Sequence, residues 1–206
     1  MLTSGPSASV VVVSLLLLAT SCQRNNEAEL WLVLAREYVK ADATLLQNEA
    51  DKKNTAAQDY AARKEAEAKL LRAEAPRNSV LQQLLRSGDA ETKKLALVNI
   101  MLRKIDDNVL LGSILEKYRI DDDMFTKFYS IQCFKDLNQN KLKVFEDSLI
   151  NILDSETNEI PIIAAMPTLA KLDKSKVELL FSRYAKTGSQ GLRDIAVLYL
   201  KGTSHE

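Results

Sequence analysis

The sequence predicts an all-α protein in which a long N-terminal helix is followed by about four helical hairpins. Only six glycines and four prolines occur in 206 residues, and the abundant Ala, Leu, Lys and Glu favour helix. Beyond an apolar run near the N-terminus, β-branched residues rarely follow one another, which disfavours strands. After Pro76, short apolar helical patterns recur at similar intervals along the chain.

The apolar run near the N-terminus predicts export. It extends from Val10 to Ala19, about half of the roughly twenty residues that a helix needs to cross a bilayer. This length is typical of the core of a cleaved signal peptide, which we place over residues 1–21. A short uncleaved anchor is the alternative.

The residues that end this run suggest how the mature chain is held. Ala19-Thr20-Ser21-Cys22 resembles the lipobox of bacterial lipoproteins, in which a signal peptidase cuts before a cysteine that bears a diacylglyceryl group. The resemblance implies that Cys22 is the acylated first residue of the mature chain. It also implies that Gln23, rather than Asp, favours the outer membrane facing the periplasm, or the cell surface. In an ordinary secretory signal, the alternative, Cys22 would have no such role.

Acylation would make the lipid bilayer a partner of this protein. Each buried CH₂ group contributes about 0.8 kcal/mol to membrane binding, so two or three acyl chains hold a protein firmly. Residues 22–26 would then form a short polar tether between the lipid and the first helix.

Residues 27–75 predict a helical stalk that resembles a coiled coil. The segment contains no glycine or proline, so it forms one helix, or two with a break near Asn54-Thr55. Unbroken, it would extend on the order of 70 Å; alternatively, residues 31–46 fold back on the C-terminal helices. Its second half consists mainly of alanine and charged residues, which is typical of a spacer. Its first half carries an apolar seam at three- and four-residue spacings: Trp31, Leu34, Tyr38, Ala41 and Leu45.

Residues 76–202 predict a series of helical repeats, and residues 203–206 a polar tail. Val80, Val109, Val144 and Val177 open similar apolar patterns at intervals of 29, 35 and 33 residues. Polar turns follow each first helix, at residues 87–89, 119–123, 154–158 and 187–189, and supply breakers and helix N-caps. A second helix then completes each hairpin, and the hairpins bury a shared core only by stacking.

The second helices carry the predicted core stripes. In the fourth repeat, Leu192-Arg193-Asp194-Ile195-Ala196 resembles HEAT and armadillo repeats, in which the second helix often carries a branched residue, then a basic residue, and alanine three positions further on. The resemblance implies a short α-solenoid over about residues 76–202, and tetratricopeptide-like hairpins are the alternative. The stripes are Leu95, Val98 and Leu102; Phe125, Phe128 and Ile131; Ile163, Met166 and Leu169; and Leu192, Ile195 and Tyr199.

The sequence contains little catalytic or metal-binding chemistry. Its single histidine, His205, lies in the polar tail. Once Cys22 is acylated, Cys133 has no cysteine to pair with, and its apolar neighbours favour a place in the core. Asp121-Asp122-Asp123 and Asp106-Asp107 lack the spacing of a calcium loop and predict helix-capping turns. We therefore predict no catalytic residue, no cofactor and no metal site.

The aromatic residues and the charge balance indicate the kind of partner. The 28 basic and 28 acidic residues cancel, which argues against nucleic acid, and no site for a small-molecule substrate is identified. Helical spacing places the central aromatic residues in the core, and a peptide groove is the alternative role. These aromatic residues are Phe125, Phe128, Tyr129, Phe134 and Phe145.

Together, these observations predict a membrane-anchored, non-enzymatic scaffold or accessory subunit of the bacterial envelope that binds another protein. Two alternative hypotheses are an envelope hydrolase or metal-dependent enzyme that uses acidic residues, and a purely structural spacer.

Overall fold

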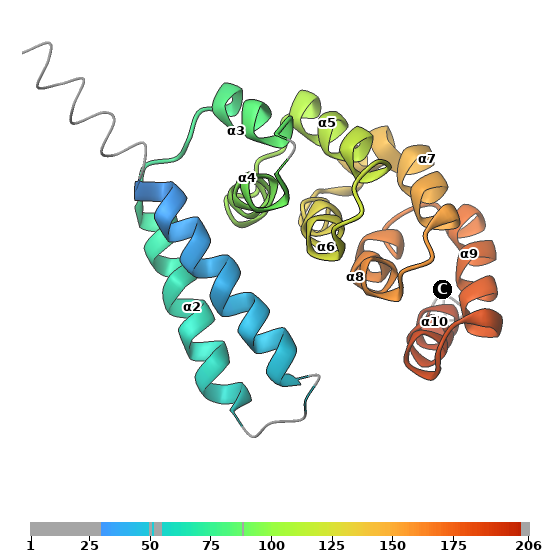
Figure 1. Cartoon of the computed structure of the whole chain (residues 1–206). Helices are drawn as coiled ribbons and strands as arrows, with labels where there is room; N and C mark the ends of the chain where they lie inside the picture. The colour runs from blue at the N-terminus through green and yellow to red at the C-terminus, as the bar shows by residue number, and fades with distance from the viewer. Residues whose placement is uncertain (1–29, 50, 52–54, 88, 203–206) are drawn as a thin grey trace, which may run out of the picture. The chain divides into compact units, whose positions relative to one another are not determined.

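The structure is a computed structural model that describes residues 30–49, 51, 55–87 and 89–202. Within these residues, every regular element is an α-helix (Figure 1), which confirms the all-α prediction. The chain divides into two compact units, residues 1–76 and 77–206. Pro76, which has no backbone N–H to continue a helix, ends the first unit.

The described part of the first unit is a two-helix hairpin. Its helices span residues 30–49 and Ala56–Arg72, the second labelled α2, and they run side by side in opposite directions (Figure 1). Arg63 Nη2 in α2 donates a hydrogen bond to Tyr38 Oη at 2.9 Å. In one straight helix these two residues would lie about 37 Å apart. The unbroken stalk is therefore wrong, and the alternative of two helices is confirmed.

The seam of this hairpin differs from the predicted one at two of five positions. Ala35 and Asp42 are buried, whereas Leu34 and Ala41 are only half-buried. The sequence did not indicate Asp42 because a carboxylate is seldom buried unless it is paired. Its partner comes from the other helix, since Arg63 Nε lies 2.6 Å from Asp42 Oδ1. The predicted seam residues that are buried are Trp31, Tyr38 and Leu45.

The described part of the second unit contains eight helices in four consecutive pairs. They are α3 (Asn78–Leu85), α4 (Ala90–Leu102), α5 (Asn108–Tyr118), α6 (Met124–Gln132), α7 (Gln139–Ser155), α8 (Glu159–Leu169), α9 (Lys174–Thr187) and α10 (Gln190–Gly202). Figure 1 shows α3, α5, α7 and α9 in one row, here called the outer row, and the even-numbered helices in an inner row. Neighbouring helices within each row pack against one another, and α3 also packs on α4, α5 on α6 and α9 on α10.

The turns between paired helices lie where the sequence predicts them. Side chains of Asp89, Asp123 and Asn158 accept hydrogen bonds from backbone N–H groups at the starts of α4, α6 and α8, as expected of N-caps. Gly188 ends α9, where a Cβ atom would lie only 2.8 Å from the carbonyl oxygen of Tyr184. Glycine is therefore needed for the close turn into α10.

The core lies one residue away from three of the four valines that mark the repeats. Val80, Val109 and Val144 are 37%, 62% and 65% exposed, and only Val177 is buried. Successive residues point about 100° apart on a helix, so an adjacent apolar pair leaves open which member faces the core. In the first three repeats the residue after the valine is buried: Leu81, Leu110 and Phe145.

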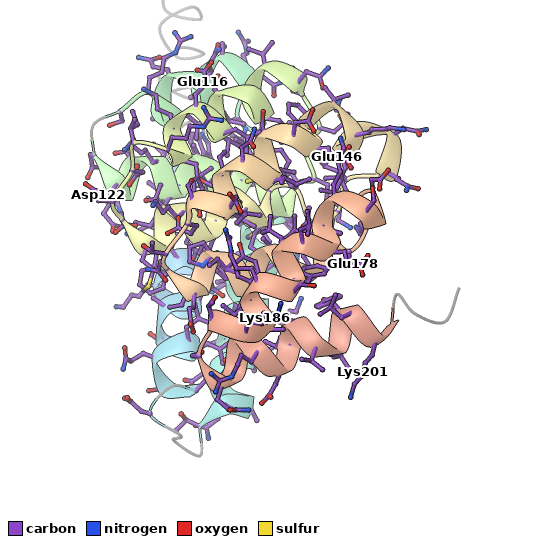
Figure 2. All side chains as sticks on the ribbon, turned by 90° about the vertical axis from the view of Figure 1, so that its right-hand side faces the viewer. Glu116, Asp122, Glu146, Glu178, Lys186 and Lys201 are labelled. Carbon is purple, nitrogen blue, oxygen red and sulfur yellow. The ribbon has the colours of Figure 1, made fainter. Side chains whose placement is uncertain are left out.

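Polar contacts join each hairpin to the next at a nearly constant separation of 28 to 30 residues. Lys127 Nζ in α6 donates to Glu156 Oε2 at 3.0 Å, and Lys176 Nζ in α9 donates to Glu146 Oε2 at 2.9 Å. Figure 2 labels Glu146 on α7. Further pairs of this kind are Asn78 with Asp107, Lys93 with Asp121, Arg183 with Asp154, and Ser189 with Glu159. Each hairpin is thus fixed to its neighbour in the same way.

Candidate protein-interaction surface

The inner helices begin at equivalent capping residues, so positions counted from the caps can be compared between helices. Asp123 Oδ1 accepts a hydrogen bond from Thr126 N at 2.7 Å, and Asn158 Oδ1 accepts one from Ile160 N at 3.0 Å. In α10, Ser189 has the same role and its Oγ accepts from Leu192 N at 3.4 Å. The residues two and five places after the first two caps are Phe125 and Phe128 in α6, and Ile160 and Ile163 in α8.

These apolar residues lie on the open side of the inner row. In α6, which is packed by α4, α5 and α8, Phe125 and Phe128 are half-buried and lie three residues apart, on one face of the helix. Ile160 is 43% exposed, and Leu198, nine places after the cap of α10, is 68% exposed. Pro167, nine places after the cap of α8, is also exposed. We call the set the inner stripe: Phe125, Phe128, Ile160, Ile163, Pro167 and Leu198.

The inner stripe is confined to the middle and end of the inner row. In α4, the residues two and five places after the cap are the charged Glu91 and Lys94, and in α10 they are Gly191 and Asp194. Apolar side chains therefore dominate on α6 and α8. Solvent-facing apolar residues that line up on adjacent helices are a common feature of interaction sites.

The five central aromatic residues divide between the core and the inner stripe. Tyr129, Phe134 and Phe145 are buried, which confirms their predicted place in the core. Phe125 and Phe128 are half-buried, so their prediction as core residues is wrong. Four other residues of the predicted core stripes are also only half-buried: Leu102, Ile163, Ile195 and Tyr199. The repeated offset from the N-cap is the sequence signal that distinguishes Phe125, Phe128 and Ile163, because helical spacing alone suits both sides of a helix.

Lysines border the inner stripe at the C-terminal ends of the inner helices. Lys135 and Lys171 follow α6 and α8, Lys201 lies in the last turn of α10, and all three are exposed. Lys171 Nζ donates a hydrogen bond to the carbonyl oxygen of Lys135, and Figure 2 shows Lys201 projecting from α10. Two exposed acids follow these lysines in the sequence: Asp136, whose carboxylate pairs with the exposed Lys104 at 3.5 Å, and Asp173, which caps α9. The border therefore carries a net positive charge.

A polar pocket of about 500 Å³ lies where α5, α6 and α7 meet. Glu156 is central to it and accepts hydrogen bonds from Tyr118 Oη at 2.7 Å and Lys127 Nζ at 3.0 Å. Burial alone would raise the pKa of Glu156, but the N–H of Asn158, the Tyr118 hydroxyl and the Lys127 ammonium lower it below its usual value. A carboxylate held in this way stays ionised at neutral pH and positions its neighbours, a structural role.

The predicted aspartate clusters cap helices. Asp123 caps α6, and Asp107 caps α5 by accepting from the N–H groups of Val109 and Leu110. Asp121 pairs with Lys93 and accepts from Asp123 N at 3.0 Å. The capping prediction is therefore confirmed. Among the described residues, no three or more His, Cys, Asp or Glu side chains are grouped so as to hold a metal ion.

The remaining predicted residues are either buried or lie outside the described part of the chain. Cys133 is buried, with its Sγ 3.5 Å from the carbonyl oxygen of Leu97, and burial raises the pKa of its thiol. This confirms its predicted place in the core. Cys22, Gln23 and His205 lie outside the described residues. In the residues that the structure describes, no helix combines the length and the apolar character needed to cross a membrane.

Comparison with protein-family models, with curated proteins and with solved structures finds no match to this chain. Its function must therefore be argued from its own residues.

Proposed function

We propose that the chain is an exported lipoprotein that acts as a non-catalytic, protein-binding scaffold or accessory subunit of the bacterial envelope. On this proposal, residues 76–202 form a short α-solenoid of degenerate HEAT-like hairpins. The observation that carries the binding role is the inner stripe, because the inner faces of helical repeats are extended surfaces suited to another polypeptide. Fold and function are separate questions, so the proposal depends on the stripe itself.

The hydrogen bonds and ion pairs of the buried acidic residues also favour a binding role over a catalytic one. Glu156, Glu146 and Asp121 each accept hydrogen bonds or ion pairs from a neighbouring hairpin or turn. A general acid or base must instead be within reach of substrate, with a pKa near the working pH. The pKa values of Glu146 and Glu156 are lowered from their usual range, which moves them away from that condition.

The proposed anchor is tested by replacing Cys22 with serine. Serine cannot form the thioether that carries the diacylglyceryl group, so we expect Cys22→Ser to move the protein from the membrane fraction to the soluble fraction. Fractionation followed by immunoblotting measures this, with Cys133→Ser as the matched control that keeps the anchor. Retention of the Cys22→Ser protein on membranes would contradict acylation.

The proposed scaffold role is tested by site-specific photo-crosslinking in cells. A photoreactive residue at position 163, on the inner stripe, should form adducts with another protein. The same residue at position 144, on the outer row, should form few, although Val144 is 65% exposed. Equal adduct yields at the two positions would contradict a binding role for the inner stripe.

A further inference from the structure

We infer that the inner stripe binds an amphipathic helix of another protein, about three turns long, with acidic residues along one flank. The inference rests on the proposed scaffold role and names the chemistry of the partner. It follows from the width of the stripe, its length across the helices, and the charge of its border.

The width of the inner stripe fits a helix. The stripe extends from two to nine places after the caps, as from Ile160 to Pro167 in α8. Seven residues at 1.5 Å each give about 10 Å along the helix axis, close to the 10–12 Å diameter of a helix with its side chains. An extended strand, spaced at about 4.8 Å from its neighbours, would leave about half of this width uncovered.

The length of the inner stripe sets the size of the bound segment. The stripe crosses α6, α8 and α10, and packed helices lie 8–10 Å apart, so it spans about 16–20 Å. A helix of about twelve residues covers this distance. Apolar residues at three- and four-residue spacings would place one face of it against Phe128, Ile163 and Leu198.

The lysine border sets the charge of the partner. Counted from the last stripe residue of its own helix, Lys201 lies three places further on, Lys171 four and Lys135 seven, all at the C-terminal ends of successive inner helices. A helix lying across these three inner helices would have one flank along all three ammonium groups. Acidic residues on that flank would be complementary, whereas lysines would be repelled.

The test uses the purified full chain and two synthetic probes of about twelve residues. Both peptides carry leucines on one helical face; one has glutamates along a flank and the other has lysines there. Fluorescence anisotropy of labelled peptide gives each Kd. We expect the acidic peptide to bind about tenfold more tightly, the effect of three exposed ion pairs, and high salt to remove most of this preference.

Variants of the chain then locate the binding. Ile163→Ser should weaken binding of the acidic peptide by at least about tenfold, since one large apolar contact is lost. Val144→Ser, at an exposed valine of the outer row, is the matched control and should have no effect. Lys171→Glu should reduce the preference for the acidic peptide, and Lys143→Glu, exposed on α7, should not. Melting curves establish that each variant folds.

Four results would overturn the inference. Equal affinity for the two peptides would show that the lysine border does not select an acidic partner. An equal loss of affinity in Ile163→Ser and Val144→Ser would show that the peptide binds outside the inner stripe. A dimer of the free chain that Ile163→Ser dissociates in sedimentation would show that a second copy occupies the stripe. If neither peptide binds while position 163 still crosslinks to another protein in cells, the scaffold role stands and the helical, acidic partner is wrong.

Discussion

Replacing Phe134 with alanine should lower the free energy of unfolding by about 3–5 kcal/mol, because it removes a fully buried aromatic ring and leaves a cavity. Phe134 is completely buried, and its ring lies edge-on to that of Phe145, with centroids 5.6 Å apart. Since Phe145 belongs to α7, this contact connects two hairpins. Urea unfolding followed by circular dichroism measures the effect.

The matched control is Phe128→Ala, six positions earlier in the same repeat. Phe128 is half-buried on the inner stripe, so we expect a loss of only about 1 kcal/mol. The two substitutions remove the same atoms from the same kind of residue, and they differ in what surrounds the ring. If Phe128→Ala destabilised the chain as much as Phe134→Ala does, the inner stripe would be part of the core and the proposed binding surface would be lost.

This pair of phenylalanines also indicates how far the sequence can predict the fold. Composition and the recurring apolar patterns predict the helices, the four turns and the all-α class, because helix propensity and capping are local properties. Which of two apolar residues faces the core depends on neighbouring helices that are distant in sequence. Phe128 and Phe134 therefore look alike in the sequence and differ in the structure.

The hairpin of the first unit is also hard to predict from the sequence, because its two helices are joined by contacts between residues that are distant in the chain. The alanine-rich second half of residues 27–75 has few large apolar residues, and its sequence alone is typical of a solvated spacer. In the structure, Arg63 from this half pairs with Asp42 and donates to Tyr38, so charged and polar side chains help to join the two helices. Apolar periodicity does not detect a seam of this kind, because a buried charge is recognised only once its partner is known.

Replacing Glu156 with alanine should destabilise the second unit by about 3 kcal/mol, the usual cost of leaving buried polar partners unpaired. Its side chain is 5% exposed and joins three segments. Oε2 accepts from Tyr118 and Lys127, and Oε1 accepts from the N–H groups of Thr157 and Asn158, each at 2.9 Å. Glu156→Gln keeps the size and one acceptor oxygen, so its loss should be smaller.

The stability lost in Glu156→Gln should depend on pH, and this dependence separates the contribution of the Glu156 charge from that of its shape. The pKa of Glu156 is lowered in the folded state, whereas a glutamate in an unfolded chain has a pKa of about 4.3. The charge therefore stabilises the fold at neutral pH, and this contribution is lost as the pH falls through the lower folded value. Glu156→Gln lacks the titration, so its deficit relative to the unsubstituted chain should be largest near neutral pH and shrink in acid.

Glu116 provides the matched control for this substitution. It is an exposed glutamate on α5, labelled in Figure 2, and Glu116→Gln should leave the unfolding midpoint at neutral pH nearly unchanged. A deficit for Glu156→Gln that stayed constant from neutral to acidic pH would mean that the carboxylate acts through packing alone. Glu156 would then hold α5, α6 and α7 together as a neutral hydrogen-bond acceptor would, and the charge of its ion pair with Lys127 would contribute nothing to the stacking of the hairpins.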